Sequence, residues 1–307
     1  LDKAIKIPAV QAAIMQKARL TQTFELNSTT YNGKKIAIIG SGPAGIGAAA
    51  VLLEQGYGVT MFEKSSRFGG ALNLIPTERL PQEAIAADWQ KLENHPHFEI
   101  KLNTDVNNYE DLLNKDFSGI IAAIGEQSCR HLGVEGENLC VSYIDYLREP
   151  QKYATGGNVA VVGGGEVALD CALTAKKFGA NVEMFVRRRL SDMRMGLDDY
   201  GELINNEINI TTMTRIGKIQ KNNNLLTAFT IKTRFNSEGK LEDIPHTEIA
   251  RPDFSLIILA LGSSCKEEKI SDRRIVYAGD CINGGSTAVE AVASGKKAAQ
   301  TLLEQIV

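Results

Sequence analysis

Cysteine is scarce in this chain, and the spacing that would make it chemically informative is missing. The 307 residues contain five cysteines, Cys129, Cys140, Cys171, Cys265 and Cys281, and no two of them form a C-x-x-C pair. Disulfide frameworks, zinc sites and iron–sulfur clusters need paired or clustered cysteines. The sequence therefore predicts none of these, and it predicts no metal site.

Long apolar runs and a charge bias are missing too. No apolar run approaches the length needed to span a membrane, about 20 residues, and the N-terminus lacks the pattern of a secretory signal. The 34 Lys plus Arg residues nearly balance the 37 Asp plus Glu residues, so the net charge of −3 favours neither nucleic acid nor a membrane as partner. We expect a cytoplasmic protein with two domains. The chain begins at Leu1 instead of Met, and we interpret it as a piece of something longer.

Glycine is what the chain has in excess, with 28 residues, and its placement indicates a dinucleotide site. An apolar strand ends at Gly40, and the turn over residues 40–45 has the form G-x-G-x-x-G before a helix rich in Ala and Leu. Such glycines allow a tight bend, a close approach of backbone to a pyrophosphate, and close packing of helix on strand. The N-terminus of the helix then attracts the anion. Glu63 ends the next strand, where its carboxylate can accept hydrogen bonds from both ribose hydroxyls.

A second copy of this unit follows the strand over residues 158–162. Its turn begins Gly163-Gly164-Gly165, and Ala168 stands at the third glycine position, which tolerates alanine. The next strand ends at Val186, so the ribose carboxylate is absent and three arginines follow, residues 187–189. Guanidinium groups bind a 2′-phosphate, which a carboxylate would repel. The pattern favours NADP(H), and the alternative is an ordinary solvated basic loop.

Two such turns predict two cofactors, FAD at the first and NADPH at the second, with hydride transfer between them. A third glycine-rich segment, residues 278–287, would close the flavin site. There Asp280 can bond the ribityl chain, and the last helix would point its N-terminus at the flavin and stabilise negative charge. Hydride transfer depends mainly on positioning, so no side chain is predicted as a catalytic acid or base.

The order of motifs resembles the two-dinucleotide-binding flavoproteins, and within them the small subunit of glutamate synthase and the equivalent module of dihydropyrimidine dehydrogenase. The resemblance covers nearly the whole chain and rests on residues 40–45, 62–70, 75–81, 132–137, 163–170, 186–189 and 278–296. It implies that Gly69 and Gly70 run along the FAD pyrophosphate and that Arg79 lies near the flavin. Together, motifs and resemblance predict these cofactor-binding residues: Gly40, Ser41, Gly42, Pro43, Ala44, Gly45, Glu63, Lys64, Gly69, Gly70, Ala71, Arg79, Val106, Gly125, Gly163, Gly164, Gly165, Glu166, Val167, Arg187, Arg188, Gly262, Gly279, Asp280, Ser286, Thr287 and Ala288.

The predicted fold is α/β, with two Rossmann-like dinucleotide-binding domains in three layers and with binding at the carboxyl ends of the parallel strands. The resemblance implies that the NADPH domain is inserted into the FAD domain. We expect a helical appendage over residues 1–32, an FAD domain over residues 33–150 and 251–307, and an NAD(P)H domain over residues 151–250.

The sequence also departs from the family pattern. Glu166 stands where Asn is frequent, Leu74 stands where Gly is frequent, and the segment 193–195 lacks a Pro. Family members carry an N-terminal iron–sulfur domain, whereas the first cysteine here is Cys129, and residues 2–8 resemble the segment that follows that domain. The hypothesis is that FAD reduced by NADPH passes electrons singly to iron–sulfur clusters in a missing domain or a partner subunit.

Other functions stay open. A disulfide reductase of the thioredoxin-reductase type needs a C-x-x-C pair, which this chain lacks. A flavin reductase or monooxygenase would need a dry substrate pocket that no segment indicates, and a non-catalytic assembly subunit would hold FAD without turnover. Cys281 is interpreted as a packing residue, and His95 and His97 are interpreted as surface residues and not as metal ligands.

Overall fold

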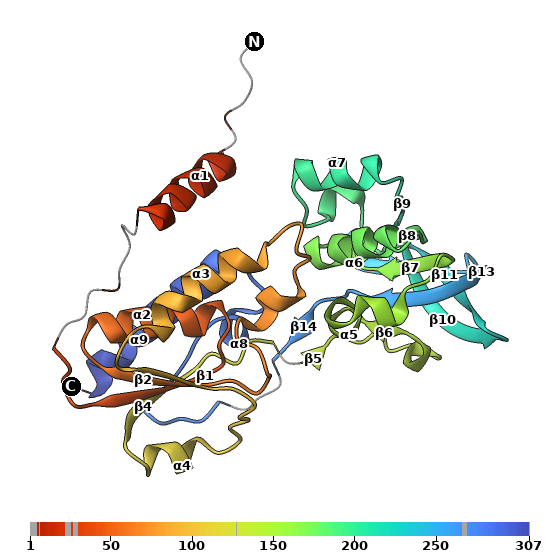
Figure 1. Ribbon diagram of the computed structural model, residues 1–307. Coiled ribbons are helices and arrows are strands. Elements are labelled where there is room, and N and C mark those ends of the chain that lie inside the picture. The colour runs from red at the N-terminus through yellow and green to blue at the C-terminus, as the bar shows by residue number, and fades with distance from the viewer. Residues whose placement is uncertain are drawn as a thin grey trace. The chain divides into compact units, whose positions relative to one another are not determined.

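The computed structural model describes residues 5, 7–21, 26, 30–126, 128–265 and 269–306. The chain divides into two compact units, which Figure 1 shows as ribbons. The first unit comprises Leu1–Leu72, Leu80–Gly125 and Glu267–Val307, and the second comprises Asn73–Arg79 and Glu126–Lys266. The second unit is therefore inserted into the first, as predicted.

The borders of the insertion lie outside the predicted residues 151–250. Strand β13 (Ile249–Leu259) pairs in parallel with β7 (Asn158–Val162), and the short β6 (Val141–Ser142) pairs with β13. Both flanking segments thus hydrogen-bond into the sheet of the second unit and belong to it. This pairing joins segments far apart in the chain, so local sequence patterns do not reveal it.

A five-stranded parallel sheet forms the centre of the first unit. Its strands, in spatial order, are β15 (Ile275–Tyr277), β4 (Phe117–Ala122), β1 (Lys35–Ile39), β2 (Gly58–Phe62) and β3 (Phe98–Lys101). Helices α2 (Pro43–Glu54), α3 (Gln82–Glu93) and α9 (Ala288–Ile306) lie over one face, and α4 (Tyr109–Leu113) lies over the other (Figure 1). The short helix α8 (Asp280–Asn283) follows β15. Ile36 and Ile38 are buried in the core beneath α2 and α9. Ala37 and Ile39 are buried on the opposite face with Tyr109, so the unit has three layers.

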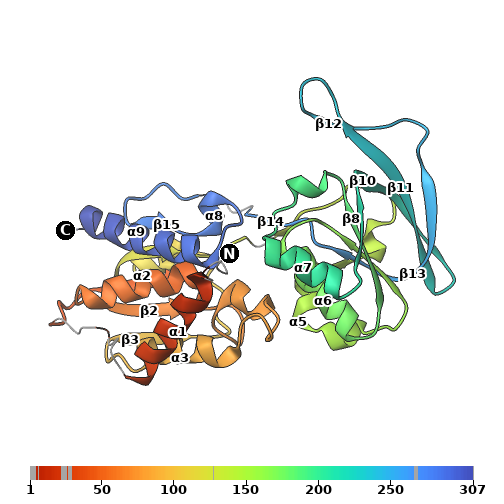
Figure 2. The same ribbon diagram turned by 90° about the horizontal axis from the view of Figure 1, so that it is seen from above.

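The second unit contains a mixed sheet with the order β10-β11-β13-β7-β8-β9. The strands not yet bounded are β8 (Asn181–Val186), β9 (Asn209–Thr212), β10 (Thr214–Asn222), β11 (Leu225–Phe235) and β12 (Leu241–Asp243). Its helices are α5 (Tyr143–Arg148), α6 (Glu166–Lys177) and α7 (Leu197–Asn205). One face of β7 and β8 packs on α6, and the other packs on apolar residues of β10 and β11. The antiparallel strands extend well beyond the helices of this unit (Figure 2).

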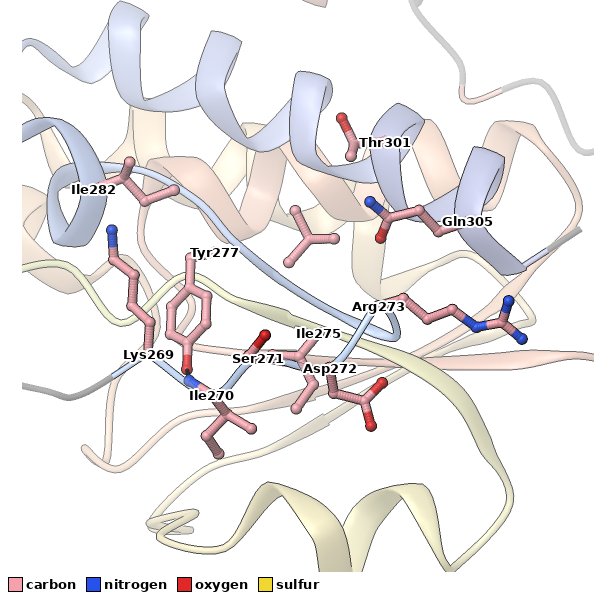
Figure 3. Close-up of a pocket in the computed structure, with 11 residues that line it drawn as sticks. Lys269, Ile270, Ser271, Asp272, Arg273, Ile275, Tyr277, Ile282, Thr301 and Gln305 are labelled. Atoms are coloured by element: carbon pink, nitrogen blue, oxygen red, sulfur yellow. Dashed lines mark hydrogen bonds between the residues drawn. The ribbon is translucent and has the colours of Figure 1, made fainter.

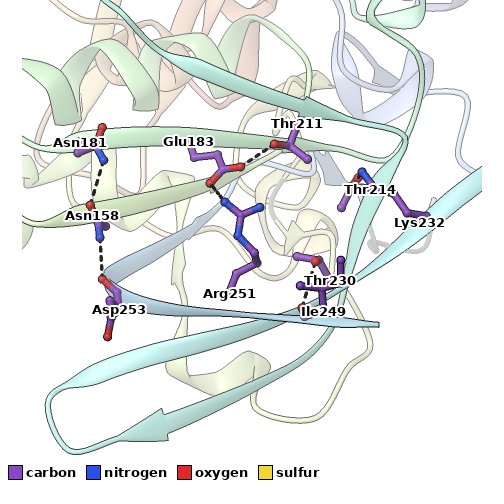
Figure 4. A network of polar contacts seen from close by, with 10 residues as sticks. All are labelled: Asn158, Asn181, Glu183, Thr211, Thr214, Thr230, Lys232, Ile249, Arg251 and Asp253. Carbon is purple, nitrogen blue, oxygen red and sulfur yellow. Dashed lines mark hydrogen bonds and ion pairs between the residues drawn. The ribbon is translucent and has the colours of Figure 1, made fainter. Parts of the chain in front are cut away.

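Polar side chains link β8, β9 and β13 (Figure 4). Glu183 accepts a 2.6 Å hydrogen bond from the Thr211 hydroxyl and forms a 2.5 Å ion pair with Arg251. The Arg251 guanidinium also lies 5.5 Å from the centroid of the Phe185 ring. Since β8 ends at Val186, directly before the three arginines, this network holds the strand that positions them.

Outside these sheets, β5 (Ser128–Cys129) pairs with β14 (Ser263–Ser264), and α1 (Ile7–Leu20) lies within the predicted appendage. Among the described residues, the helices are all too short or too polar to cross a membrane.

Candidate functional site

The turn between β1 and α2 excludes side chains at two of its three glycines. Gly40 has a φ of +100°, and a Cβ there would lie 2.3 Å from the carbonyl oxygen of Ala123. A Cβ on Gly45 would lie 2.1 Å from the carbonyl oxygen of Gly40. Gly42 differs, because its φ of −70° suits any residue and a Cβ there would meet no atom within 4 Å. The fold therefore leaves the space beside Gly42, where a Cβ would lie, unfilled.

Helix α2 starts at this turn without a side-chain cap. Gly42 is the N-cap residue and makes no side-chain hydrogen bond, and Pro43 follows with no N–H of its own. The N–H groups of Ala44 and Gly45 lie in the first turn, where a helix offers no carbonyl partner. Together with the helix dipole they form a site suited to a phosphate group.

The glycine pair implied by the resemblance lies against this turn. The Gly69 N–H donates to the Ser41 Oγ at 3.1 Å, and a Cβ on Gly70 would lie 3.0 Å from the Gly42 Cα. Residues from two separate segments thus surround the space beside Gly42, which is the arrangement that a pyrophosphate needs.

Glu63 lies at the end of β2 and is 6% exposed. One carboxylate oxygen accepts hydrogen bonds from the Ser41 N–H and hydroxyl at 3.0 and 2.6 Å, and the other from the Ser65 N–H and hydroxyl at 2.9 and 2.7 Å. Burial alone would raise the pKa of Glu63, but these hydrogen bonds lower it below the ordinary 4.5. The predicted ribose contacts would therefore require the serine hydroxyls to turn away from the carboxylate.

The acid stability of the protein depends on this carboxylate. Its pKa is lower in the folded chain, so ionised Glu63 stabilises the fold above pH 4.5 and loses this effect as pH falls through the folded pKa. We expect Glu63→Gln to lower the free energy of unfolding at neutral pH by about 1–3 kcal/mol, because an amide cannot accept from both serines. Urea denaturation at neutral and acidic pH tests this. The difference from wild type should shrink in acid, and the exposed Glu99→Gln should change little at either pH.

The third glycine-rich segment is packed directly on the first turn. A Cβ on Gly279, where φ is +78°, would lie 2.8 Å from the Ala44 Cβ, and one on Gly295 would lie 1.9 Å from the Ala44 carbonyl oxygen. These glycines bring the segment after β15 and helix α9 against α2. Residue Gly279 of the segment 278–287 thus lies at the first turn, and the closure of a flavin site by this segment stays a prediction.

Polar groups at the start of α9 are already paired with each other. The Ser286 hydroxyl donates to Asp280 at 2.5 Å, and the Glu290 carboxylate accepts from the N–H and hydroxyl of Thr287, both at 2.9 Å. Both hydrogen bonds from Thr287 lower the pKa of Glu290. Sequence reasoning missed this carboxylate, which reduces the positive field expected at the N-terminus of α9. Val289 beside it is 79% exposed, an apolar surface available to a ring system.

Five further predicted residues make less specific contacts. Lys64 and Ala71 are exposed, and Val106 packs on the core cluster that contains Tyr109. Gly125 and Gly262 follow β4 and β13 with φ of +65° and +84°, so each ends its strand in a turn that favours glycine.

The second turn, between β7 and α6, resembles the first, because two of its glycines are packed against other atoms and one is not. Gly163 has a φ of +153°, and a Cβ there would lie 2.2 Å from the Ala260 carbonyl oxygen. A Cβ on Gly164 would lie 2.9 Å from Val186, whereas one on Gly165 would meet no atom within 4 Å. The φ of −119° at Gly165 suits any residue. Here too, one glycine opens onto space that the fold leaves unfilled.

Helix α6 begins at Glu166, after the N-cap Gly165, without a side-chain cap. Glu166 is exposed and Val167 is half-buried. Ala168 is fully buried, and a Cβ on Gly163 would lie 3.2 Å from its methyl group. The alanine at the third glycine position therefore fits where the helix meets the strand.

The arginines after β8 do not behave alike. We call residues 187–192 the arginine loop. The side chains of Arg187 and Arg188 are exposed, and within the described part of the chain neither forms an ion pair. Arg189 instead contacts Asp192 through two nitrogens, at 3.0 and 3.1 Å. Two of the three arginines are thus available to an anion.

Arg194 is a candidate that sequence reasoning missed. Its N–H donates to the Gly164 carbonyl at 3.1 Å, and it forms an isolated parallel bridge with Gly165. Its side chain is exposed and, in the described ranges, forms no ion pair. A cation is therefore attached to the glycine turn itself. The available signal was a basic residue in a segment where the family pattern has a proline.

Arg79 lies in the second unit. Its guanidinium pairs with Asp170 at 2.6 Å and approaches Asp199 at 3.7 Å, on α6 and α7. Burial raises the pKa of Asp170 and the pair with Arg79 lowers it, with a net rise. The neighbouring Glu78 forms an ion pair with Lys177, also on α6. These contacts attach Arg79 to the second unit, whereas the resemblance implies a place near the flavin.

The histidines and cysteines can be compared with their interpretation from the sequence. The surface interpretation of His95 is wrong, because the residue is 7% exposed and its Nε2 has no hydrogen-bond partner in the described structure. Among the described residues, no group of three His, Cys, Asp or Glu side chains could hold a metal. Cys281 is 7% exposed and donates to the Ala278 carbonyl at 3.2 Å. This burial agrees with the interpretation of Cys281 as a packing residue.

The surface of the described chain also has two hollows. One of about 570 Å³ lies in the first unit (Figure 3), and none of its lining residues is a predicted site residue; they are Lys269, Ile270, Ser271, Asp272, Arg273, Ile275, Val276, Tyr277, Ile282, Thr301 and Gln305. The other, of about 480 Å³, is lined by Arg189, Leu190, Ser191 and Tyr200, beside the arginine loop.

Comparison with known proteins finds both relatives and a shared fold. The family model described as pyridine nucleotide-disulphide oxidoreductase matches residues 34–295. The beta subunit of the NADP(+)-dependent formate dehydrogenase of Moorella thermoacetica is 36% identical over 181 residues, which are 55% of this chain and 26% of that protein. The NAD-dependent dihydropyrimidine dehydrogenase subunit PreT of Escherichia coli K12 is 28% identical over 298 residues, 87% of this chain and 67% of that protein.

Among solved structures, FprA of Mycobacterium tuberculosis in complex with NADPH matches with a TM-score of 0.75 at 16% identity, over 91% of this chain and 85% of that chain. This likeness shows the fold, and it agrees with the predicted pair of Rossmann-like domains. The chain spans about a quarter of the length of the formate dehydrogenase subunit and 67% of PreT.

Proposed function

The chain belongs to the pyridine nucleotide-disulphide oxidoreductases, a family of NAD(P)H-dependent flavin oxidoreductases that use FAD and NADPH, and from this premise we propose that it transfers hydride from NADPH to FAD and passes the electrons to an iron–sulfur acceptor. One observation carries the proposal. Each of the two units has a glycine turn in which two glycines are required by packing and the remaining one, Gly42 or Gly165, opens onto unfilled space.

In the first unit, the residues fit an FAD molecule. The open side of Gly42 and the N–H groups at the start of α2 would hold the pyrophosphate, with Gly69 and Gly70 along it. The exposed Val289 would lie against the ring system. Bound FAD accepts a hydride and can release electrons one at a time, whereas the protein supplies binding, orientation and electrostatics.

In the second unit, the arginine loop favours NADPH over NADH. The relatives are named for either nucleotide, one NADP-dependent and one NAD-dependent, so the choice depends on this chain's own residues. Val186 stands where a ribose-binding carboxylate would be, and Arg187 and Arg188 are exposed beside it. Two guanidinium groups can bind the negatively charged 2′-phosphate, which a carboxylate in this place would repel.

The proposed electron acceptor is an iron–sulfur cluster and not a disulfide, because this chain lacks the cysteine pair that a disulfide reductase uses. None of its five cysteines forms a disulfide, and the absence of a C-x-x-C pair argues against a disulfide reductase. The two sequence relatives described above are each named as a subunit of a dehydrogenase. We place the iron–sulfur clusters in another domain or subunit that receives single electrons from the flavin.

The direct test is the reduction of the flavin. The purified chain, loaded with FAD, should show flavin absorbance that NADPH bleaches under anaerobic conditions, and NADPH should then drive continuous reduction of ferricyanide, a one-electron acceptor. Flavin that binds but is not bleached would instead support a non-catalytic assembly subunit. Rapid turnover with oxygen in place of ferricyanide would support a flavin reductase or monooxygenase.

A further inference from the structure

The backbone of the arginine loop is held in place by groups from three segments outside the loop. The Thr233 hydroxyl on β11 donates to the Arg187 carbonyl at 2.7 Å, and the Met213 N–H donates to the Arg188 carbonyl at 3.1 Å. The Tyr200 hydroxyl on α7 donates to the Leu190 carbonyl at 2.8 Å. The carbonyls of residues 187, 188 and 190 are thus fixed from outside the loop, so the loop has its shape before any ligand binds.

The side chain of Arg189 is held by contacts with the side chains of Asp192 and Phe235. Its guanidinium makes two hydrogen bonds with Asp192, and its own N–H donates to the same carboxylate at 3.1 Å. The guanidinium carbon lies 4.7 Å from the centroid of the Phe235 ring, the last residue of β11. This planar group therefore has one face on an aromatic ring and one edge on a carboxylate, a geometry in which arginine is well ordered.

The pairing also removes an electrostatic problem. The Asp192 carboxyl is ionised at neutral pH, and hydrogen bonds from Arg189 hold its pKa below the ordinary value. An unpaired carboxylate in this loop would repel a phosphate group bound by Arg187 and Arg188. Arg189 cancels this charge and leaves the other two arginines as the net positive charge of the loop.

We propose that Phe235, Arg189 and Asp192 form a positioning stack that presets the arginine loop for a 2′-phosphate. The nucleotide preference would then depend on the β11–β12 hairpin, where Phe235 pairs with Leu241, as well as on the arginines that touch the phosphate. The inference rests on the proposed NADPH site and deepens it. Arg189 is assigned here to positioning, not to direct contact with the ligand.

The test uses the FAD-loaded chain and two readouts, steady-state KM values for NADPH and NADH and calorimetric binding of 2′,5′-ADP. A cation–π contact at an exposed site contributes about 0.5–1 kcal/mol, which corresponds to about two- to fivefold in affinity. Phe235→Leu should raise KM for NADPH and the Kd for 2′,5′-ADP by about that factor, with kcat and KM for NADH unchanged. Phe235→Tyr, which keeps the aromatic face, should behave as wild type. Arg234→Ala, which removes the neighbouring cation paired with Glu242, is the matched control and should change neither readout.

A double variant decides whether Phe235 acts through Arg189. In the stack, Phe235→Leu should add nothing to the loss caused by Arg189→Ala, and additive losses would overturn the proposal. Equal 2′,5′-ADP affinity in wild type and Phe235→Leu would also overturn it while leaving the NADPH site intact. If wild type itself does not bind 2′,5′-ADP, it is the proposed NADPH preference that fails.

Discussion

Replacing Arg187 and Arg188 together by Ala is expected to lower kcat/KM for NADPH by about 10²- to 10⁴-fold while leaving kcat/KM for NADH within about threefold. Each hydrogen-bonded ion pair with a phosphate contributes about 1.5–3 kcal/mol, and both side chains are exposed with no ion pair to lose in the described structure. NADH lacks the 2′-phosphate, so it never makes these contacts. Steady-state ferricyanide reduction with each nucleotide measures the two ratios.

The control must remove equal charge from elsewhere in the same unit. Arg234 and Lys240 lie on the β11–β12 hairpin, where they pair with Glu242 and Glu238. The variant Arg234→Ala/Lys240→Ala should leave both nucleotides nearly unaffected, apart from a general weakening that added salt removes. An equal loss for NADPH and NADH in the Arg187→Ala/Arg188→Ala variant would mean that the arginine loop is an ordinary basic surface.

The parts of the site that the sequence predicts are those encoded within a few residues. The glycine turns, the helices after them and the two exposed arginines are local patterns, because the backbone geometry of a turn and its ligand contacts come from the same short segment. Gly40 and Gly163 have the positive φ that such turns require. The insertion of one domain in the other is not such a local pattern, and its prediction comes from the resemblance to the two-dinucleotide-binding flavoproteins.

The parts that it does not predict depend on pairing between distant segments. Arg79 lies against Asp170, and Phe235 lies against Arg189, and no periodicity joins either pair. The assignment of β13 to the second sheet has the same cause, since strand partners are chosen by packing over the whole unit. The burial of His95 at the end of α3 likewise depends on the fold around it and not on its neighbours in sequence.

A methyl group at Gly42 is expected to weaken FAD binding by about 5- to 150-fold without destabilising the chain that lacks FAD. The φ of −70° accepts alanine, and the added Cβ meets no atom within 4 Å, so the fold is free of strain. Gly→Ala at a compatible position stabilises by about 0.4–1 kcal/mol. The same methyl group would occupy the space of the pyrophosphate, and overpacking of this kind costs about 1–3 kcal/mol. Urea denaturation of the flavin-free protein and titration with FAD measure the two effects separately.

Two companion variants make this result specific. Gly45→Ala places a Cβ 2.1 Å from the Gly40 carbonyl oxygen and should destabilise the flavin-free chain, which Gly42→Ala should not. Gly165→Ala, open in the same way in the second unit, should keep full FAD content and raise KM for NADPH and NADH alike, because both share the pyrophosphate. Normal FAD affinity in Gly42→Ala would place the pyrophosphate elsewhere. A loss confined to NADPH in Gly165→Ala would show that this turn contacts the 2′-phosphate and not the pyrophosphate.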